Sequence, residues 1–309
     1  MPEAVVIGSI NMDLVIQVPR FPAPGETITG GDLQTYPGGK GANQAAALSR
    51  HQIRTAMVGK VGDDPYGQQL IQSLRDQQVD ISGVRISGES ATGSALISVT
   101  AEGENSIILS PGANGSICTE DIDPSKGLIA SSSVMLLQLE IPLPAVEYAA
   151  SMGREQGLKV ILNPAPAAEL PHALLESVDI LAPNESELAL LSGREISDIS
   201  DAESAANRLL DRGIPVVIVT LGDQGALLVE KSGSQHIPAA EVEVVDTTAA
   251  GDSFIGGLAA GILQHKPLPE AVRYANIAGA LATTKSGAQP SLPTAAEVEN
   301  FYLSGTKSK

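Results

Sequence analysis

The sequence predicts an α/β fold built on a central, mostly parallel sheet with helices on both faces. From Thr55 onward, short apolar or β-branched runs alternate with longer helical patterns, an alternation typical of parallel sheets covered on both sides. Within each of the stretches 21–36 and 92–110, extended pieces follow one another with no helix between them, so we expect these stretches to form a small antiparallel sheet apart from the main one. We therefore interpret 1–309 as one large domain that carries this small sheet.

In the first half of the chain, apolar runs and turn residues mark the expected elements. Ala4–Gly8 is a short apolar run that ends in glycine, as buried strands commonly do, and Phe21–Gly31 is a loop rich in proline and glycine. A run of alanines begins the first helix near Ala45. The expected strands are 4–8 and 55–58, the helices start at 45 and cover 65–77, and the extended pieces are 27–29, 32–36, 92–100 and 106–109.

The second half has a more regular pattern. Val216–Thr220 is strongly β-branched and predicts a strand, and Thr294 with Glu297 three residues later is a capping-box signature for the last helix. A small-residue run followed by the apolar positions from Phe254 to Leu263 predicts another helix. The expected strands are 134–139, 160–162, 180–182 and 216–220, and the expected helices are 143–156, 199–212, the segment ending at 263, 268–283 and the segment from 294.

Composition excludes several classes of function. The formal net charge is −17, which argues against nucleic acid as a partner because that binding depends on clustered lysine and arginine. We expect no signal peptide and no membrane span, and the single cysteine, Cys118, fits a reducing cytoplasm. An acidic protein must hold a phosphate chain locally, with backbone amides, a metal ion and a few placed lysines.

Polar residues follow most of the predicted strands. Asn11 and Asp13 follow the first strand, and similar residues recur at Gln138–Glu140, Asn163–Pro166, Asn184–Glu187 and Thr220–Gly225. Ligands of open α/β sheets bind at the carboxyl ends of the strands, so this recurrence predicts a cleft lined with acid and amide groups. Its Asn184 and Glu187 suit an oxygen-ligated Mg²⁺. The alternative at Asn11 and Asp13 is a simple turn.

The segment Val245–Phe254 contains the strongest candidate for chemistry. Ala249, Ala250 and Gly251 have almost no side chain and precede a helix, where unpaired amides and the helix dipole favour an anion. The carboxylate of Asp252 lies beside them. An anion site next to a base suits phosphoryl transfer from a nucleotide to a hydroxyl. The alternative is that Asp252 only caps the helix.

A second glycine-rich loop, Pro37–Gln44, lies ahead of the first helix. It is not a P-loop, because Gly41 stands where Ser or Thr should follow Lys40, and it is not a dinucleotide fingerprint, because Gln44 stands where glycine is needed. The second test removes a nicotinamide-dependent oxidoreductase from consideration. The loop still offers Lys40 and Asn43 to a ligand, unless it is only a glycine turn.

Two of these motifs together resemble the signatures of a known family. Gly38–Asn43 and Asp246–Asp252, with Asn163–Pro166, Asn184–Glu187 and Gly287–Ser291, resemble the ribokinase-type (PfkB) sugar kinases over Gly8 to about Pro293. The resemblance implies a ribokinase-like α/β fold in which the small sheet is a lid. It also implies transfer of phosphate from ATP to the 5-hydroxyl of a sugar, with D-ribose expected first.

The resemblance also implies roles for individual residues. Asp252 would be the general base, and the amides of Ala249, Ala250, Gly251 and Asp252 would form the anion hole. The sugar would contact Asn11, Asp13, Gly39, Lys40, Asn43, Glu140 and Asp252. ATP would contact Asn184, Thr220, Gly222, Gly225, Gly251 and Asn276. Mg²⁺ would be held by Asn184 and Glu187, and an activating K⁺ would be surrounded by Asp246, Thr248, Ala282, Lys285, Gly287 and Ser291.

Some positions depart from the family pattern and leave alternatives open. Asp223 is unexpectedly acidic near phosphate, and position 276, here Asn276, varies among relatives. The substrate could instead be 2-deoxyribose, another pentose or a nucleoside. A sugar-binding regulator without catalysis is a further alternative, against which the intact Gly251–Asp252 pair argues. We also expect a homodimer joined lid to lid, because the lid carries the apolar residues Ile28, Leu33, Leu96, Ile97, Val99, Ile107 and Leu109.

Overall fold

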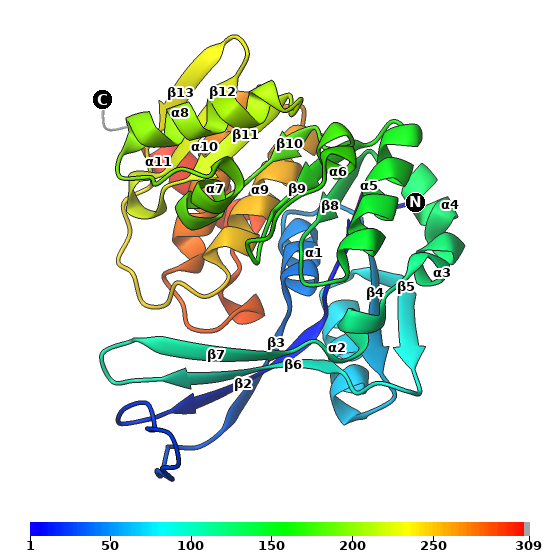
Figure 1. Cartoon of the computed structure of the whole chain (residues 1–309), viewed down its shortest axis with the longest axis vertical. Helices are drawn as coiled ribbons and strands as arrows, with labels where there is room; N and C mark the ends of the chain where they lie inside the picture. The colour runs from blue at the N-terminus through cyan, green and yellow to red at the C-terminus, as the bar shows by residue number, and fades with distance from the viewer. Residues whose placement is uncertain (306–309) are drawn as a thin grey trace.

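The main sheet has nine strands and determines where every other element lies (Figure 1). The computed structural model describes residues 1–305, so the last four residues of the expected domain lie outside it. The strand order is β13-β12-β11-β10-β9-β8-β1-β4-β5, parallel from β11 to β5 and antiparallel at β12 and β13. The strands are β1 Ala4–Ile7, β4 Thr55–Gly62, β5 Asp80–Ser87, β8 Val134–Leu137, β9 Lys159–Leu162, β10 Ile180–Leu181, β11 Val216–Thr220, β12 Ala226–Glu230 and β13 Gly233–Ile237.

Helices cover both faces of this sheet, as the sequence predicts. Alternation along β1 sends Val5 and Ile7 into a core with α5 and α8, and Ala4 and Val6 into a core with α1, α9 and α10. The helices are α1 Lys40–Arg50, α2 Pro65–Asp76, α3 Thr119–Ile122, α4 Lys126–Ala130, α5 Leu143–Glu155, α6 His172–Glu176, α7 Glu185–Ser192, α8 Ile199–Asp211, α9 Ala250–Leu263, α10 Leu268–Ala282 and α11 Ala295–Gly305. Of the helices in residues 1–305, none has the length and apolarity to cross a bilayer.

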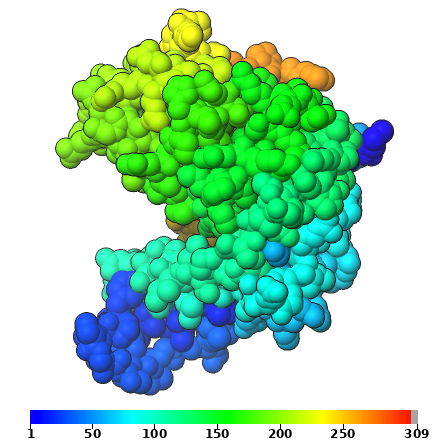
Figure 2. Space-filling view, turned by 45° about the vertical axis from the view of Figure 1, so that its right-hand side comes forward, coloured from blue at the N-terminus to red at the C-terminus, as the bar shows by residue number. Residues whose placement is uncertain are grey.

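A separate four-stranded sheet, which we call the lid, projects from the body (Figure 1). Its order is β3-β2-β6-β7, with bounds β2 Asn11–Gln17, β3 Gln34–Gly38, β6 Gly93–Val99 and β7 Asn105–Ser110. The expectation of a purely antiparallel lid is wrong, because β2 and β6 run parallel. Figure 2 shows a deep hollow between lid and body.

The lid also contains a strand that the sequence analysis missed. β2 begins at Asn11, within the stretch interpreted as polar residues after a strand. The chain passes from β1 into β2 through Gly8–Ile10 alone, so no helix or long loop signals the change of sheet. Conversely, 27–29 forms no strand, and β3 covers only the end of the expected piece 32–36 and continues to Gly38.

Candidate active site

Asp252 lies in the first turn of α9, at its third residue. Its side chain is buried, 7% exposed. It does not cap its helix: Oδ2 accepts a hydrogen bond from Asn43 Nδ2 at 2.9 Å, and Oδ1 accepts one from Gln44 Nε2 at 3.0 Å. Both donors come from α1, which packs against α9. The carboxylate is therefore held from the side by two amides.

One of the four amides proposed for the anion nest, that of Ala250, already has an acceptor in the structure. Ala249 has a left-handed backbone, with φ of 59°, and this residue turns the chain into the helix. The N–H of Ala250 donates to Thr247 O at 3.2 Å, so that amide already has an acceptor. Gly251 and Asp252 occupy the second and third helical positions, where an N–H has no acceptor within the helix. These two amides, together with that of Ala249, remain the candidates for binding an anion.

The predicted sugar contacts come together where β1, β2, β8 and α1 meet. Glu140 Oε2 accepts hydrogen bonds from Ser9 Oγ at 2.5 Å, Asn11 Nδ2 at 3.4 Å and the Lys40 N–H at 3.2 Å. Gly39 has φ of 88°, and a Cβ there would lie 2.7 Å from Asn11 N. Glycine is thus required at position 39 for the loop to approach the start of the lid.

Negative charge dominates this group of residues, the proposed sugar pocket. Burial lowers the pKa of Lys40, but the carboxylates of Asp252, Glu140, Glu187 and Asp13 outweigh it and raise that pKa above its usual value. Burial, with Glu140 and Asp252 nearby, raises the pKa of Asp13 to about 7. A single lysine faces four carboxylates, so a ligand that offers hydroxyl donors, or a cation, would relieve the repulsion.

We expect Asp13→Asn to stabilise the ligand-free protein at alkaline pH. Between the ordinary value of 3.8 and about 7, the unfolded chain ionises Asp13 while the folded chain keeps it protonated, so stability falls as pH rises through this window. Above it the full cost, on the order of 2–4 kcal/mol, is present. Urea unfolding should show a gain for Asp13→Asn that grows from pH 5 to pH 8, with the exposed Asp63→Asn as control. An equal gain at both pH values would contradict this account.

A large cleft is lined in part by Ala250, Gly251 and Phe254 of α9. Its volume is about 1090 Å³, and all six residues predicted to contact ATP line it: Asn184, Thr220, Gly222, Gly225, Gly251 and Asn276. Asn276 donates both amide hydrogens to the backbone, to Ile237 O at 2.9 Å and Pro238 O at 3.1 Å. Its NH₂ group is therefore already paired and fixes the wall of the cleft at Ile237 and Pro238. Asp223 also lines the cleft.

Asn184 and Glu187 form the capping box of α7. Glu187 Oε2 accepts from the Asn184 N–H at 2.9 Å and Oε1 from Asn184 Nδ2 at 3.1 Å. Asn184 Oδ1 already accepts from the Glu187 N–H and Ser186 Oγ, each at 2.8 Å. The carboxylate of Glu187 is thus the oxygen donor with unused lone pairs, and burial raises its pKa. This geometry fits a hydrated Mg²⁺ better than direct ligation by Asn184.

The residues predicted to surround a monovalent cation lie in two segments that Asp246 joins by hydrogen bonds. Asp246 Oδ1 accepts from Thr248 N and Oγ1 at 2.9 and 2.6 Å, and Oδ2 accepts from the Gly287 N–H at 2.8 Å. Burial raises the pKa of Asp246, but these hydrogen bonds outweigh it and hold the pKa below its usual value. Ala282 is the last residue of α10, shortly before Lys285 and Gly287 in the sequence, and Ser291 is buried.

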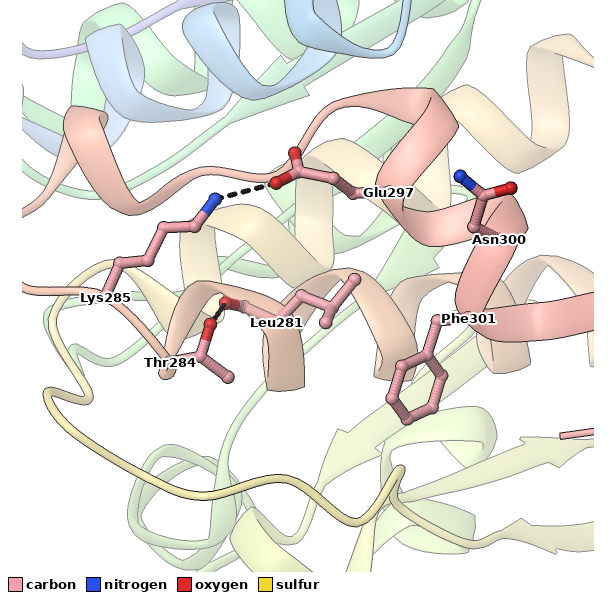
Figure 3. Close-up of a pocket in the computed structure, with 6 residues that line it drawn as sticks. All are labelled: Leu281, Thr284, Lys285, Glu297, Asn300 and Phe301. Carbon is pink, nitrogen blue, oxygen red and sulfur yellow. Dashed lines mark hydrogen bonds and ion pairs between the residues drawn. The ribbon is translucent and has the colours of Figure 1, made fainter. Parts of the chain in front are cut away.

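Lys285 contributes its backbone at most to this predicted cation site. Its Nζ pairs with Glu297 of α11 at 2.8 Å, beside a separate cavity of about 380 Å³ (Figure 3). The side chain thus turns toward α11.

Four buried polar residues of the site were not assigned by the sequence analysis. Gln44, Gln138 and Asn114 are at most 1% exposed, and Ser9 is fully buried. Asn114 Oδ1 accepts from the Ile10 N–H at 2.9 Å, and its Nδ2 donates to Asn11 Oδ1 at 2.7 Å, so it anchors the start of the lid. Gln44 was noted only as the residue that breaks a dinucleotide motif. The only local signal at Gln44 was an amide directly before the alanine run Ala45–Ala47.

Comparisons with known proteins agree with this geometry. A family model described as pfkB family carbohydrate kinase matches residues 1–295. Ribokinase of Haemophilus influenzae is 42% identical over 296 residues, covering 96% of this chain and 97% of that protein. Deoxyribokinase of Salmonella typhi is 36% identical over 303 residues, covering 98% and 99%.

A solved structure has the same fold along nearly the whole chain. Arabidopsis thaliana ribokinase complexed with ribose and ATP superposes with a TM-score of 0.90 at 33% identity, covering 97% of this chain and 98% of that one. The parallel sheet, the small separate sheet and the two signature loops are therefore those of one family. The chain belongs to the pfkB family of carbohydrate kinases, phosphotransferases whose acceptor is an alcohol group.

Proposed function

We propose that this kinase transfers the γ-phosphoryl group of ATP to the 5-hydroxyl of D-ribose. The observation that carries the proposal is the position of Asp252. Gly251, the residue before it, lines the large cleft. The charge of Asp252 also contributes to raising the pKa of Asp13 and of Lys40 in the proposed sugar pocket. A base between a nucleotide cleft and a hydroxyl-binding pocket is the arrangement that in-line phosphoryl transfer requires.

In the proposed reaction, Asp252 accepts the proton of the sugar hydroxyl as that oxygen attacks. The amides of Gly251 and Asp252 hold the γ-phosphate at the positive end of α9. Mg²⁺, held through water by Glu187 with Asn184 beside it, would neutralise charge on the phosphate oxygens. Lys40 would balance the carboxylates of the pocket. Closure of the lid over the sugar would exclude water as a competing acceptor.

The sugar specificity follows from the polar pocket. Asn11 and the carboxylate of Asp13 would bind ring hydroxyls, and a buried polar group loses its partner when a hydroxyl is missing. A panel of pentoses and nucleosides assayed with MgATP tests the proposal, with D-ribose expected to have the highest kcat/KM. The similarity to a deoxyribokinase makes phosphorylation of 2-deoxyribose the second candidate. Equal kcat/KM for ribose and 2-deoxyribose would remove the assignment of Asn11 and Asp13 to the 2-hydroxyl.

We expect K⁺ to activate the enzyme and Na⁺ to replace it only in part. Asp246 ties Thr248 to Gly287, so the loop can present carbonyl groups to a cation beside the anion nest. Asp246→Asn would set an amide NH₂ against one of these donors and loosen the loop. The K⁺ concentration for half-maximal activity should rise about 10–100-fold. Full activity in K⁺-free buffer would contradict the proposed cation site.

We expect a homodimer joined through the lid. Paired residues share a face of a sheet, so Leu109 and Ala95 lie on the face of Asp13, while Leu96 and Ile108 lie on the other. Leu96 is 49% and Ile108 is 68% exposed, and a second copy would cover them. Light scattering at micromolar concentration should give a dimer mass, and Ile108→Glu a monomer. Leu190→Glu, at an exposed apolar residue of α7, should remain dimeric. A monomeric wild type would exclude this assembly.

We further propose that the enzyme works in the cytoplasm. Its thiol, Cys118, is free and exposed, as a reducing compartment permits, and ATP is supplied there.

A further inference from the structure

We propose that Gln44 is a positioning residue for Asp252, and that Gln138 fixes the orientation of the Gln44 amide. The inference rests on the proposed function, in which Asp252 is the general base. Gln44 follows Asn43 on α1, and Gln138 directly follows β8. Both side chains are fully buried. Neither lines the nucleotide cleft. Gln44 contacts Asp252 directly and Gln138 reaches it through Gln44.

The side chains of Gln138, Gln44 and Asp252 form a continuous chain of hydrogen bonds, which we call the relay. Gln138 Nε2 donates to Gln44 Oε1 at 2.6 Å, and Gln44 Nε2 donates to Asp252 Oδ1 at 3.0 Å. Gln44 Nε2 also lies 3.3 Å from Asn163 Oδ1, and Asn163 Nδ2 donates to Ala182 O at 3.2 Å. Asn163 thereby presents its oxygen, not its NH₂ group, to Gln44. Gln138, which follows β8, and Asn163, which follows β9, thus both contact the Gln44 amide, and Gln44 alone of the three contacts Asp252 Oδ1.

Hydrogen-bond chemistry determines the direction of this chain. An ionised carboxylate can only accept, so Gln44 must turn its NH₂ group toward Asp252. Gln44 Oε1 then faces Gln138, which must donate. Because Asn43 donates to the other oxygen of Asp252, the ionised form receives a donor on each oxygen. A protonated Asp252 would place its O–H against one of these two NH₂ groups. The relay therefore favours the form of Asp252 that accepts a proton.

The arrangement leaves two buried acceptors unpaired. Gln138 Oε1 and Asn43 Oδ1 have no hydrogen-bond partner among the described residues. A Cβ on Gly8 would lie 2.0 Å from Gln138 Oε1, so glycine at this position makes room for the amide. An unpaired buried acceptor destabilises the fold. One such acceptor belongs to Asn43, which donates to Asp252, and the other to Gln138, which donates to Gln44. Donation toward the carboxylate therefore determines how these two amides are oriented.

The test is the pH dependence of kcat in variants that keep side-chain volume. Gln44→Met removes one donor from the carboxylate, so the acid limb of the kcat profile should move up by about one pH unit, a tenfold change in the ionisation equilibrium. Gln138→Met should move it less, because Gln44 is still present but no longer fixed. The double variant should match Gln44→Met alone, since Gln138 acts only through Gln44. The affinity for MgATP should stay within about twofold in all three.

Matched controls separate positioning from general loss of packing. Gln72 is an exposed amide that donates to Asp76 Oδ1 at 2.8 Å, so Gln72→Met removes the same kind of hydrogen bond away from the site and should leave the profile unchanged. If Gln44→Met fails to fold, Gln138→Met decides the question. An acid limb that coincides with the wild type in Gln138→Met and in any folded Gln44→Met would overturn the relay.

A measurement without turnover distinguishes this inference from the proposed function. The ¹³C carboxyl resonance of Asp252, assigned by its loss in Asp252→Asn, can be titrated in the ligand-free protein. Its midpoint should move to higher pH in Gln44→Met. If the wild type phosphorylates no sugar yet the midpoint moves, the proposed function fails and the relay stands. If the wild type is an active kinase and the midpoint is unchanged, the relay fails alone.

Discussion

Asp252→Asn is expected to lower kcat by about 10²–10⁴-fold while the fold is retained, because the general base is removed and its size is kept. MgATP should bind at least as tightly, since a negative charge beside the proposed γ-phosphate position is lost. An asparagine also sets its NH₂ group against Asn43 or Gln44, both of which donate to residue 252. The free energy of unfolding should therefore change by only about 1–2 kcal/mol.

Asp201→Asn is the matched control for this variant. Asp201 is the third residue of α8, as Asp252 is of α9, and both stand in the acidic first turn. If Asp252 acted only through the helix dipole, the two variants would lose similar stability and neither would lose much activity. Near-normal turnover in Asp252→Asn would exclude it as the base.

Gly251→Val is expected to abolish productive ATP positioning while leaving Asp252 in place. A Cβ on Gly251 meets no atom within 4 Å, and the residue lines the nucleotide cleft. The fold should therefore tolerate valine, but its methyl groups would occupy the space where the γ-phosphate approaches the amides. We expect kcat/KM for ATP to fall by about 10²–10³-fold, the effect of losing one oxyanion donor.

Gly127→Val provides the comparison for this effect. Gly127 is the second residue of α4 and also has no atom within 4 Å of a built Cβ. It shares the helical position of Gly251 but lies outside the cleft, so its variant should keep full activity. Equal ATP kinetics for Gly251→Val and the wild type would show that the nest at α9 does not hold phosphate.

The central strands of the main sheet were predictable because they are buried on both faces, whereas the partly exposed edge strand β5 was missed. Runs such as Val134–Leu137 and Val216–Thr220 are apolar or β-branched throughout and carry their own signal. The hairpin of β12 and β13 was missed, because β13 reads Gly-Ser-Gln-His-Ile and is largely exposed. β2 was missed because pairing with β3 and β6 in the lid, rather than the three-residue connection after β1, defines it.

The parts of the candidate site that contain motif glycines and carboxylates were predictable from the sequence. The buried amide side chains that hydrogen-bond to them were less predictable. Gly39 and Asp252 belong to recognisable motifs, and the structure brings Asn43 to Asp252 as part of the same site. The role of Gln44 depends on Gln138, 94 positions away in the chain. Asn114 reaches Ile10 across 104 positions. Such contacts arise only from the folded topology, so no local pattern reveals them.

The most direct test of the account is the identity of the phosphorylated product. The wild type should be incubated with D-ribose, MgATP and K⁺, and the products followed by ³¹P NMR with coupling to ¹H. We predict a single phosphomonoester coupled to the two C5 protons of ribose, formed in step with ADP and with little inorganic phosphate. Release of inorganic phosphate without a sugar phosphate, or a phosphate on another hydroxyl, would contradict the proposed transfer.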